Sequence, residues 1–154
     1  MVGAAISDDR IMTELVGDGV HVHPAVMKIA INGKGIDKVM AISDSLPCAY
    51  LPEGEQMEFA GQFIHVEGGV ARLPDNTIAG SITSSDKILK RLHIELGYEL
   101  NEAAYMTSTA HAFSLGLDNT GQIAEGMKAD IAVLNKNLDV VATIIEGKIV
   151  YTAK

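Results

Sequence analysis

IMTELVGDGVHVHPAVMKIAINGKGIDKVMAISDS, residues 11–45, decides the fold of this 154-residue chain. Residues 11–16 predict a short strand, which residues 20–22 continue beyond a glycine-rich loop. Residues 24–33 predict a helix, because a proline suits its first position, apolar residues follow at helical spacing and glycines end it. The continuous apolar run 39–42 is typical of a strand buried on both faces of a parallel sheet. Together these segments predict a βαβ unit.

Polar residues gather where the two predicted strands end. Asp18 and His21 follow the first strand, and Asp44 follows the second. Ligands bind at this edge of parallel α/β folds and barrels, so these residues either form a binding site or cap the turns that follow. His21 and His23 would share one face of a strand, so the pair also allows a metal site or a buried strand end.

The rest of the chain is expected to form a β insertion, two helices and a β module. Residues 51–76 predict a β-hairpin. Ser84 or Ser85 begins a helix whose apolar face ends at Gly97, and a second helix runs from Asn101 to Gly116, with His111 as a surface or packing residue. The domain prediction is α/β for 1–116 and C-terminal β strands for 117–154.

Composition excludes several classes of protein. Hydrophobic residues make up 47% of the chain and aromatic residues 5%, so the core is aliphatic. The net charge of −8 and the lack of a Lys/Arg cluster argue against nucleic acid or an anionic membrane as a partner. No apolar run approaches the ~20 residues of a membrane span, and the N-terminus lacks a signal pattern. The lone Cys48 predicts a small buried hydrophobe in a protein of the reducing cytoplasm.

Four motifs carry a family resemblance: DGVH at 18–21, Asp44 in AISDS, TIAGS at 77–81 and GQIAEGMKADIAVL at 121–134. In this order they strongly resemble the C-terminal part of the N-acetylglucosamine-6-phosphate deacetylases of the amidohydrolase superfamily. The similarity runs from VGAAISDDR to TIIEGKIVY and covers nearly the whole chain.

The resemblance implies a (β/α)₈ TIM barrel with a small β-sandwich, of which this chain supplies strands seven and eight, their helices and the last β strands. A complete barrel needs about 250 residues. The family's divalent metal, expected to be zinc, is held by a Glu and two His on earlier strands, which have no counterpart here. We therefore expect no metal ligand in this chain and no tight metal binding by it alone.

The resemblance also implies site residues. Asp44 matches the catalytic aspartate, which takes a proton from the metal-bound water and passes it to the departing amine. His21 would bind the sugar phosphate, and Gly80 would permit close approach of the backbone. The implied substrate contacts are Asp18, Gly19, Val20 and His21 in one loop, and Ile78, Ala79 and Gly80 in another.

Two further points follow from the resemblance. The matching segments end the barrel, so the histidine pair is not a first-strand metal motif, and His23 is a helix-start residue. The chain departs from the family in having Ser43 before the aspartate and SLPCAY after it, and in lacking an asparagine–proline pair in MTSTAHAF, residues 106–113.

The expected function is therefore that of a C-terminal fragment of a hydrolase that deacetylates N-acetylglucosamine 6-phosphate to glucosamine 6-phosphate and acetate, inactive alone. An open parallel strand edge invites association, so we expect a homodimer or binding of the missing N-terminal half. The alternative is a non-catalytic phosphosugar-binding or assembly module derived from this fold.

Overall fold

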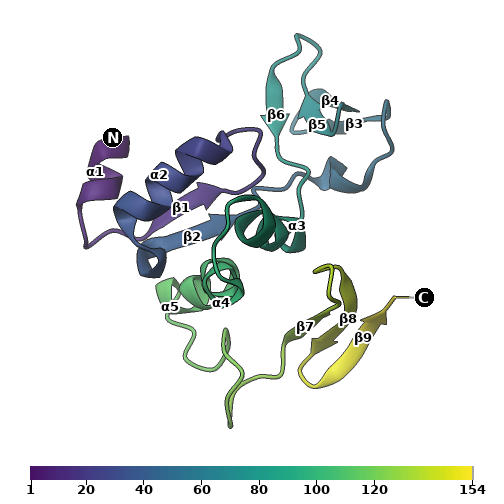
Figure 1. Ribbon diagram of the computed structural model, residues 1–154. Helices are drawn as coiled ribbons and strands as arrows, with labels where there is room; N and C mark the ends of the chain where they lie inside the picture. The colour runs from purple at the N-terminus through teal and green to yellow at the C-terminus, as the bar shows by residue number, and fades with distance from the viewer. Residues whose placement is uncertain (154) are drawn as a thin grey trace.

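The computed structural model describes residues 1–153 as a βαβ unit, a helical layer and two antiparallel sheets (Figure 1). β1 (Thr13–Val16) and β2 (Val39–Ile42) pair in parallel, and α2 (Pro24–Lys34) connects them. A single 3₁₀ turn, Ile36–Lys38, leads into β2. The predicted βαβ unit is confirmed, whereas residues 20–22 form a loop and do not extend the strand.

The start of α2 explains the second histidine of the opening stretch. His23 is the N-cap, and its Nδ1 accepts a hydrogen bond from the backbone N–H of Ala25 at 3.2 Å. Pro24 then occupies a first-turn position, where a missing N–H costs nothing. The predicted helix-start role of His23 is confirmed. Because residues 17–23 are not a strand, the two histidines do not share a strand face.

The first of the two helices predicted after the β insertion packs its apolar face against the βαβ unit. α3 (Ser85–Lys90) continues directly into the π-helical turn η3 (Arg91–Glu95). Ile88, Leu92 and Leu96 are buried in the same core as α2, and Gly97 follows with φ 79°. The predicted apolar face and glycine stop are confirmed, although the π turn has no signal in the spacing.

The second helix has three consecutive parts, α4 (Leu100–Ala104), η4 (Tyr105–Thr109) and α5 (Ala110–Ser114). It starts one residue before the predicted Asn101, and a capping box between Glu99 and Glu102 closes its first turn. His111 Nε2 lies 3.1 Å from the carbonyl oxygens of Ala41 and Met106, which ties α5 to β2. The packing role predicted for this histidine is confirmed.

The β insertion is larger than the predicted hairpin. It forms one antiparallel sheet of four consecutive strands around a small core that includes Cys48, Ile64 and Ala71. Cys48 is fully buried, as predicted. The strands are β3 (Gln56–Phe59), β4 (Gln62–Glu67), β5 (Val70–Arg72) and β6 (Ile78–Gly80).

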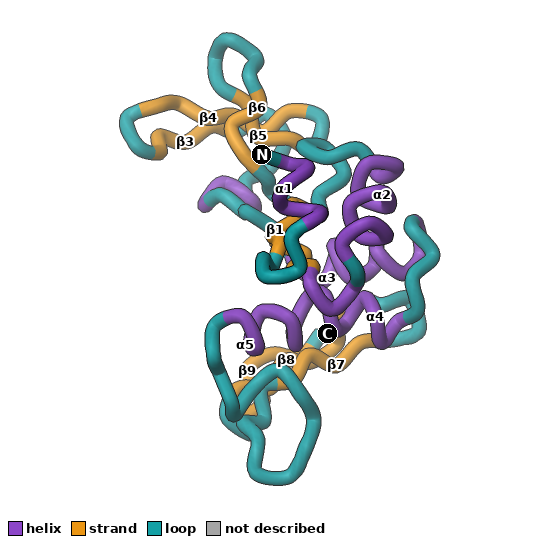
Figure 2. Tube along the Cα trace, turned by 90° about the vertical axis from the view of Figure 1, so that its left-hand side faces the viewer, coloured by secondary structure: helices purple, strands orange, loops and turns teal. Residues whose placement is uncertain are grey.

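The predicted C-terminal β strands form a three-stranded meander. β7 (Ile131–Leu134), β8 (Val140–Ile145) and β9 (Lys148–Thr152) pair antiparallel in chain order. Figure 2 shows the two antiparallel sheets at opposite ends, with the helices between them.

At the N-terminus, α1 (Val2–Ser7) lies against α2 and β1, where Thr13 Oγ1 donates to Ala5 O. Within residues 1–153, the helices are too short or too polar to cross a membrane.

Removing a core side chain from η3 tests the helix packing. Leu92→Ala is expected to lower the free energy of unfolding by about 2–5 kcal/mol, because a fully buried side chain leaves a cavity. Ile94→Ala, on the same turn but 67% exposed, is the matched control and should stay within about 0.5 kcal/mol of the wild type. Urea denaturation measures both, and equal losses would contradict the assigned face.

Candidate active-site edge

Three segments that the sequence singles out meet at one edge of the molecule. The backbone N–H of Gly17 donates to Ile42 O at 2.9 Å, so the chain leaves β1 and β2 side by side. Ser45 then pairs in parallel with Ser81, and the N–H of Leu46 donates to Ser81 O at 2.8 Å. The DGVH loop and Asp44 therefore lie at the carboxyl edge of the parallel strands, as predicted, and the end of TIAGS lies beside them.

Asp18 organises the DGVH loop from inside. Its Oδ1 accepts the backbone N–H groups of Val20 and His21, at 2.9 and 3.0 Å, and its Oδ2 lies 2.7 Å from His21 Nδ1. The residue is 3% exposed. Burial raises the pKa of this carboxyl, but the hydrogen bonds from His21 and Val20 outweigh burial and leave the pKa below its ordinary value. The loop is therefore built around an ionised carboxylate.

Arg91 supports the same loop from behind. Its Nη1 donates to Gly17 O at 3.0 Å, and its Nε donates to Glu95 at 2.6 Å. Gly19 has φ 72°, and a Cβ there would lie 3.0 Å from the guanidinium carbon. The sequence prediction missed Arg91, because its i,i+4 partner Glu95 is visible in the sequence but its loop contact spans 74 residues.

Asp44 and His21 present their side chains differently. Asp44 is exposed and has φ 49°, the left-handed region that aspartate tolerates better than most residues. Backbone strain of this kind clusters at functional sites. The His21 side chain is 30% exposed with one ring nitrogen held by Asp18, and the neighbouring Val20 is exposed. The edge thus offers one open carboxylate and one partly open imidazole.

The second predicted substrate segment is a strand of the insertion sheet. Ile78 and Gly80 belong to β6 and pair with Arg72 and Ala71 of β5. A Cβ at Gly80 would lie 2.7 Å from Leu46 Cδ1, so this glycine makes room for a side chain of the same chain. Ile78 remains 37% exposed and Ala79 is half-buried.

A catalytic metal site needs about three protein ligands. Over the described range 1–153, no three His, Cys, Asp or Glu side chains are placed to hold a metal ion. The donor set of this edge therefore does not fit such a metal by itself.

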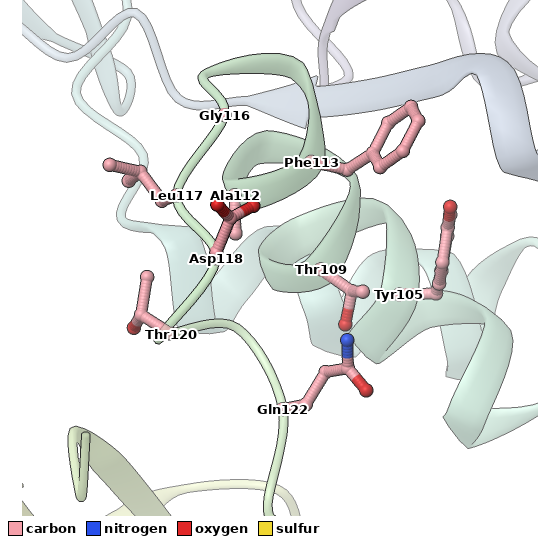
Figure 3. A pocket seen from close by; sticks show the side chains of 9 residues that line it. All are labelled: Tyr105, Thr109, Ala112, Phe113, Gly116, Leu117, Asp118, Thr120 and Gln122. Atoms are coloured by element: carbon pink, nitrogen blue, oxygen red, sulfur yellow. The ribbon is translucent and has the colours of Figure 1, made fainter. Parts of the chain in front are cut away.

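A hollow of about 530 Å³ lies elsewhere, between the last helix and the loop that follows it. In the close view of Figure 3, Thr109 and Gln122 turn toward each other across its wall. The Thr109 hydroxyl donates to Gly121 O at 2.6 Å, which holds the loop against the helix. None of the predicted site residues lines this hollow. Its lining is Tyr105, Thr109, Ala112, Phe113, Gly116, Leu117, Asp118, Thr120 and Gln122.

Comparison with known proteins identifies the family. Residues 74–151 match the model of the Amidohydrolase family. The chain is 32% identical to a putative N-acetylgalactosamine-6-phosphate deacetylase of Escherichia coli (strain K12), over 97% of this chain and 89% of that protein. The chain belongs to the amidohydrolase family. This chain is also 34% identical, over 100% of its own length, to the N-acetylglucosamine-6-phosphate deacetylase of Bacillus subtilis (strain 168).

Solved structures agree with the family assignment. The N-acetylglucosamine-6-phosphate deacetylase of Thermotoga maritima superposes with a TM-score of 0.91 at 33% identity, over 98% of this chain and 41% of that one. A Mycobacterium smegmatis deacetylase variant in complex with N-acetyl-D-glucosamine-6-phosphate gives a TM-score of 0.90 at 29% identity, over 97% and 40%. The amidohydrolase chain spans 39% of the Bacillus subtilis relative.

The Asp18 network predicts a pH dependence of stability. The folded-state pKa of Asp18 lies below the ordinary value of 3.8, so its contribution is complete at neutral pH. On acidification the unfolded chain takes up the proton first, so this contribution is lost as the pH falls below 3.8 through the folded pKa. The stability advantage of the wild type over Asp18→Asn should shrink in that range. Urea midpoints measured across pH check this, and an unchanged advantage would contradict it.

Proposed function

We propose that this amidohydrolase chain forms the last two strand–helix units of a (β/α)₈ barrel, with residues 1–116 in the barrel region and 117–154 in a small β domain. The complete enzyme would deacetylate N-acetylglucosamine 6-phosphate to glucosamine 6-phosphate and acetate. The observation that carries the proposal is the meeting of the DGVH loop, Asp44 and β6 at the carboxyl edge of β1 and β2. Support comes from relatives described as deacetylases of acetylated hexosamine phosphates.

In this proposal Asp44 moves the proton of the reaction. Its exposed carboxylate accepts a proton from the water that attacks the acetamide carbonyl. The same proton then passes to the nitrogen as the C–N bond breaks, which releases acetate and the free amine. An exposed, ionisable group at the end of a rigid buried strand suits this shuttle, because the strand fixes the position of its Cα.

The sugar phosphate is assigned to the DGVH loop and β6. His21 of this loop would contact the phosphate, and Ile78, Ala79 and Gly80 would flank the sugar ring. The buried Asp18 and the half-buried Gly19 would hold the loop in shape, and the exposed Val20 would face the ligand. The hydrolytic divalent metal, zinc by family resemblance, would be held by the Glu and two His of the earlier barrel strands, which this chain does not supply.

The free edge of β1 is the proposed contact with the rest of the barrel. In the described residues β1 pairs on one side only, with β2. A hollow of about 350 Å³ runs along it between α1 and α2, with a mostly apolar lining that includes Val2, Leu15 and Val26. A parallel sheet is stable when both faces are covered and more strands are added. The proposed partner is the N-terminal part of the barrel, or else a second copy of the chain.

We also propose a cytoplasmic location for the protein. The free thiol of Cys48 is buried, which suits a reducing compartment.

An activity assay on the completed enzyme tests the function. The chain would be combined with the N-terminal barrel portion and acetate release from N-acetylglucosamine 6-phosphate measured. Asp44→Asn is expected to lower kcat by about 10²–10⁴-fold with little change in KM, because proton transfer is lost while binding remains. Asp9→Asn is the control, because it removes the same negative charge from an exposed residue, and it should leave kcat unchanged.

The outcomes separate the alternatives. Turnover by the completed enzyme but not by the chain alone supports the proposal. Turnover with stoichiometric tight metal by the chain alone would contradict the need for a partner. Binding of the sugar phosphate without turnover in the completed assembly would instead assign a non-catalytic phosphosugar-binding role.

A further inference from the structure

We propose that Asp18 is a positioning residue that fixes the ring proton of His21 on Nδ1. As a result, His21 donates a hydrogen bond to a phosphate monoester only in its imidazolium form. The inference rests on the phosphosugar function proposed above and adds the protonation state in which the loop binds its ligand.

The geometry of the pair determines where the proton lies. The Asp18 side chain is 2% exposed, and both of its oxygens accept hydrogen bonds within the loop. An ionised carboxylate is an acceptor only, so a contact of 2.7 Å with Nδ1 requires the proton on that nitrogen. Asp18 therefore acts through His21, because its own oxygens are buried and already accept hydrogen bonds within the loop.

The other ring nitrogen decides what His21 offers. In a neutral imidazole with a proton on Nδ1, Nε2 carries a lone pair and is an acceptor. Phosphate oxygens are acceptors too, so the neutral ring cannot bond them. Nε2 makes no hydrogen bond to other residues in the described part of the chain, and the side chain is 30% exposed. Protonation turns Nε2 into a charged donor, and the imidazolium ring then lies between the Asp18 carboxylate at Nδ1 and the ligand dianion at Nε2.

In the part of the chain that the structure describes, the other charged side chains near the loop make no hydrogen bond to the His21 ring. Arg91 from η3 packs against Gly19 and is paired with Glu95, and Asp44 follows β2 on the adjacent strand end. Among residues 1–153, only Asp18 accepts a hydrogen bond from the His21 ring. The coupling between phosphate binding and proton uptake is therefore assigned to this pair.

Replacing one carboxylate oxygen of Asp18 with an amide nitrogen is expected to move the His21 ring proton to the other nitrogen. In Asp18→Asn, the amide oxygen can still accept the N–H groups of Val20 and His21. The amide nitrogen then takes the place of Oδ2 and donates to Nδ1, which moves the ring proton to Nε2. The neutral ring of this variant is already a donor, so its phosphate contact no longer needs proton uptake.

The tautomer is measured by nitrogen NMR on the chain labelled with ¹⁵N-histidine. His21 is assigned by the signal that disappears in His21→Gln. With the ring in its neutral form, the wild type is expected to carry its proton on Nδ1, Asp18→Asn on Nε2, and the control Asp9→Asn on Nδ1. A wild-type proton on Nε2, or no change in Asp18→Asn, would overturn the proposal. This readout does not depend on deacetylase activity, so a failed activity assay leaves it intact.

The coupling is measured with N-acetylglucosamine 6-phosphate as the probe. Phosphate has its own second pKa of about 6, and the His21→Gln variant, which cannot titrate, reports that contribution. Wild-type affinity should exceed that of this variant where the ring is an imidazolium, and the advantage should disappear as rising pH makes the ring neutral. The affinity of Asp18→Asn should show the same pH dependence as that of His21→Gln. Equal pH dependence of the wild type and His21→Gln would overturn the coupling.

Discussion

The parallel pairing of β1 and β2 is the constraint on which the rest of the structure depends. Parallel strands need a crossover, and α2 supplies it, so both strands end on the same side of the molecule. The hydrogen bond from Gly17 to Ile42 carries the pairing to the last residue of β2. The loop of Asp18 and the turn of Asp44 therefore start next to each other, although these two aspartates lie 26 positions apart in the sequence.

Two glycines allow the close packing that holds the carboxyl edge of β1 and β2 in place. A Cβ at Gly17 would lie 2.4 Å from Ile88 Cγ2, and one at Gly80 would lie 2.7 Å from Leu46 Cδ1. Each glycine lets a side chain from a distant segment fill the space beside the backbone. Protein interiors tolerate few voids, so these contacts hold the strand ends against α3 and against the insertion. Leu46 lies two residues after Asp44, so its packing against Gly80 also holds the turn that carries this aspartate.

Where local signals were strong, the sequence predictions were close. The apolar run of β2 has the predicted bounds, and α2 starts at the predicted Pro24. The stretch at 20–22 differed, because the Asp18 side chain offers backbone N–H groups an alternative to strand pairing. The insertion sheet is larger than the predicted hairpin because β3 pairs with β4, and β6 pairs with β5 across an irregular register. The turns η3 and η4 add residues to helices without disturbing the apolar spacing.

The sequence by itself determined the βαβ unit, the amphipathic helices and the residue types at the strand ends, because periodicity, capping and turn chemistry act over a few neighbouring residues. Only the tertiary structure decided that Asp18 is buried beneath His21, that Arg91 supports their loop and that Gly80 makes room for Leu46. The contacts of Arg91 and Gly80 join segments 34 to 74 residues apart. Such contacts are set by how rigid elements fit together, which no local pattern of residues encodes.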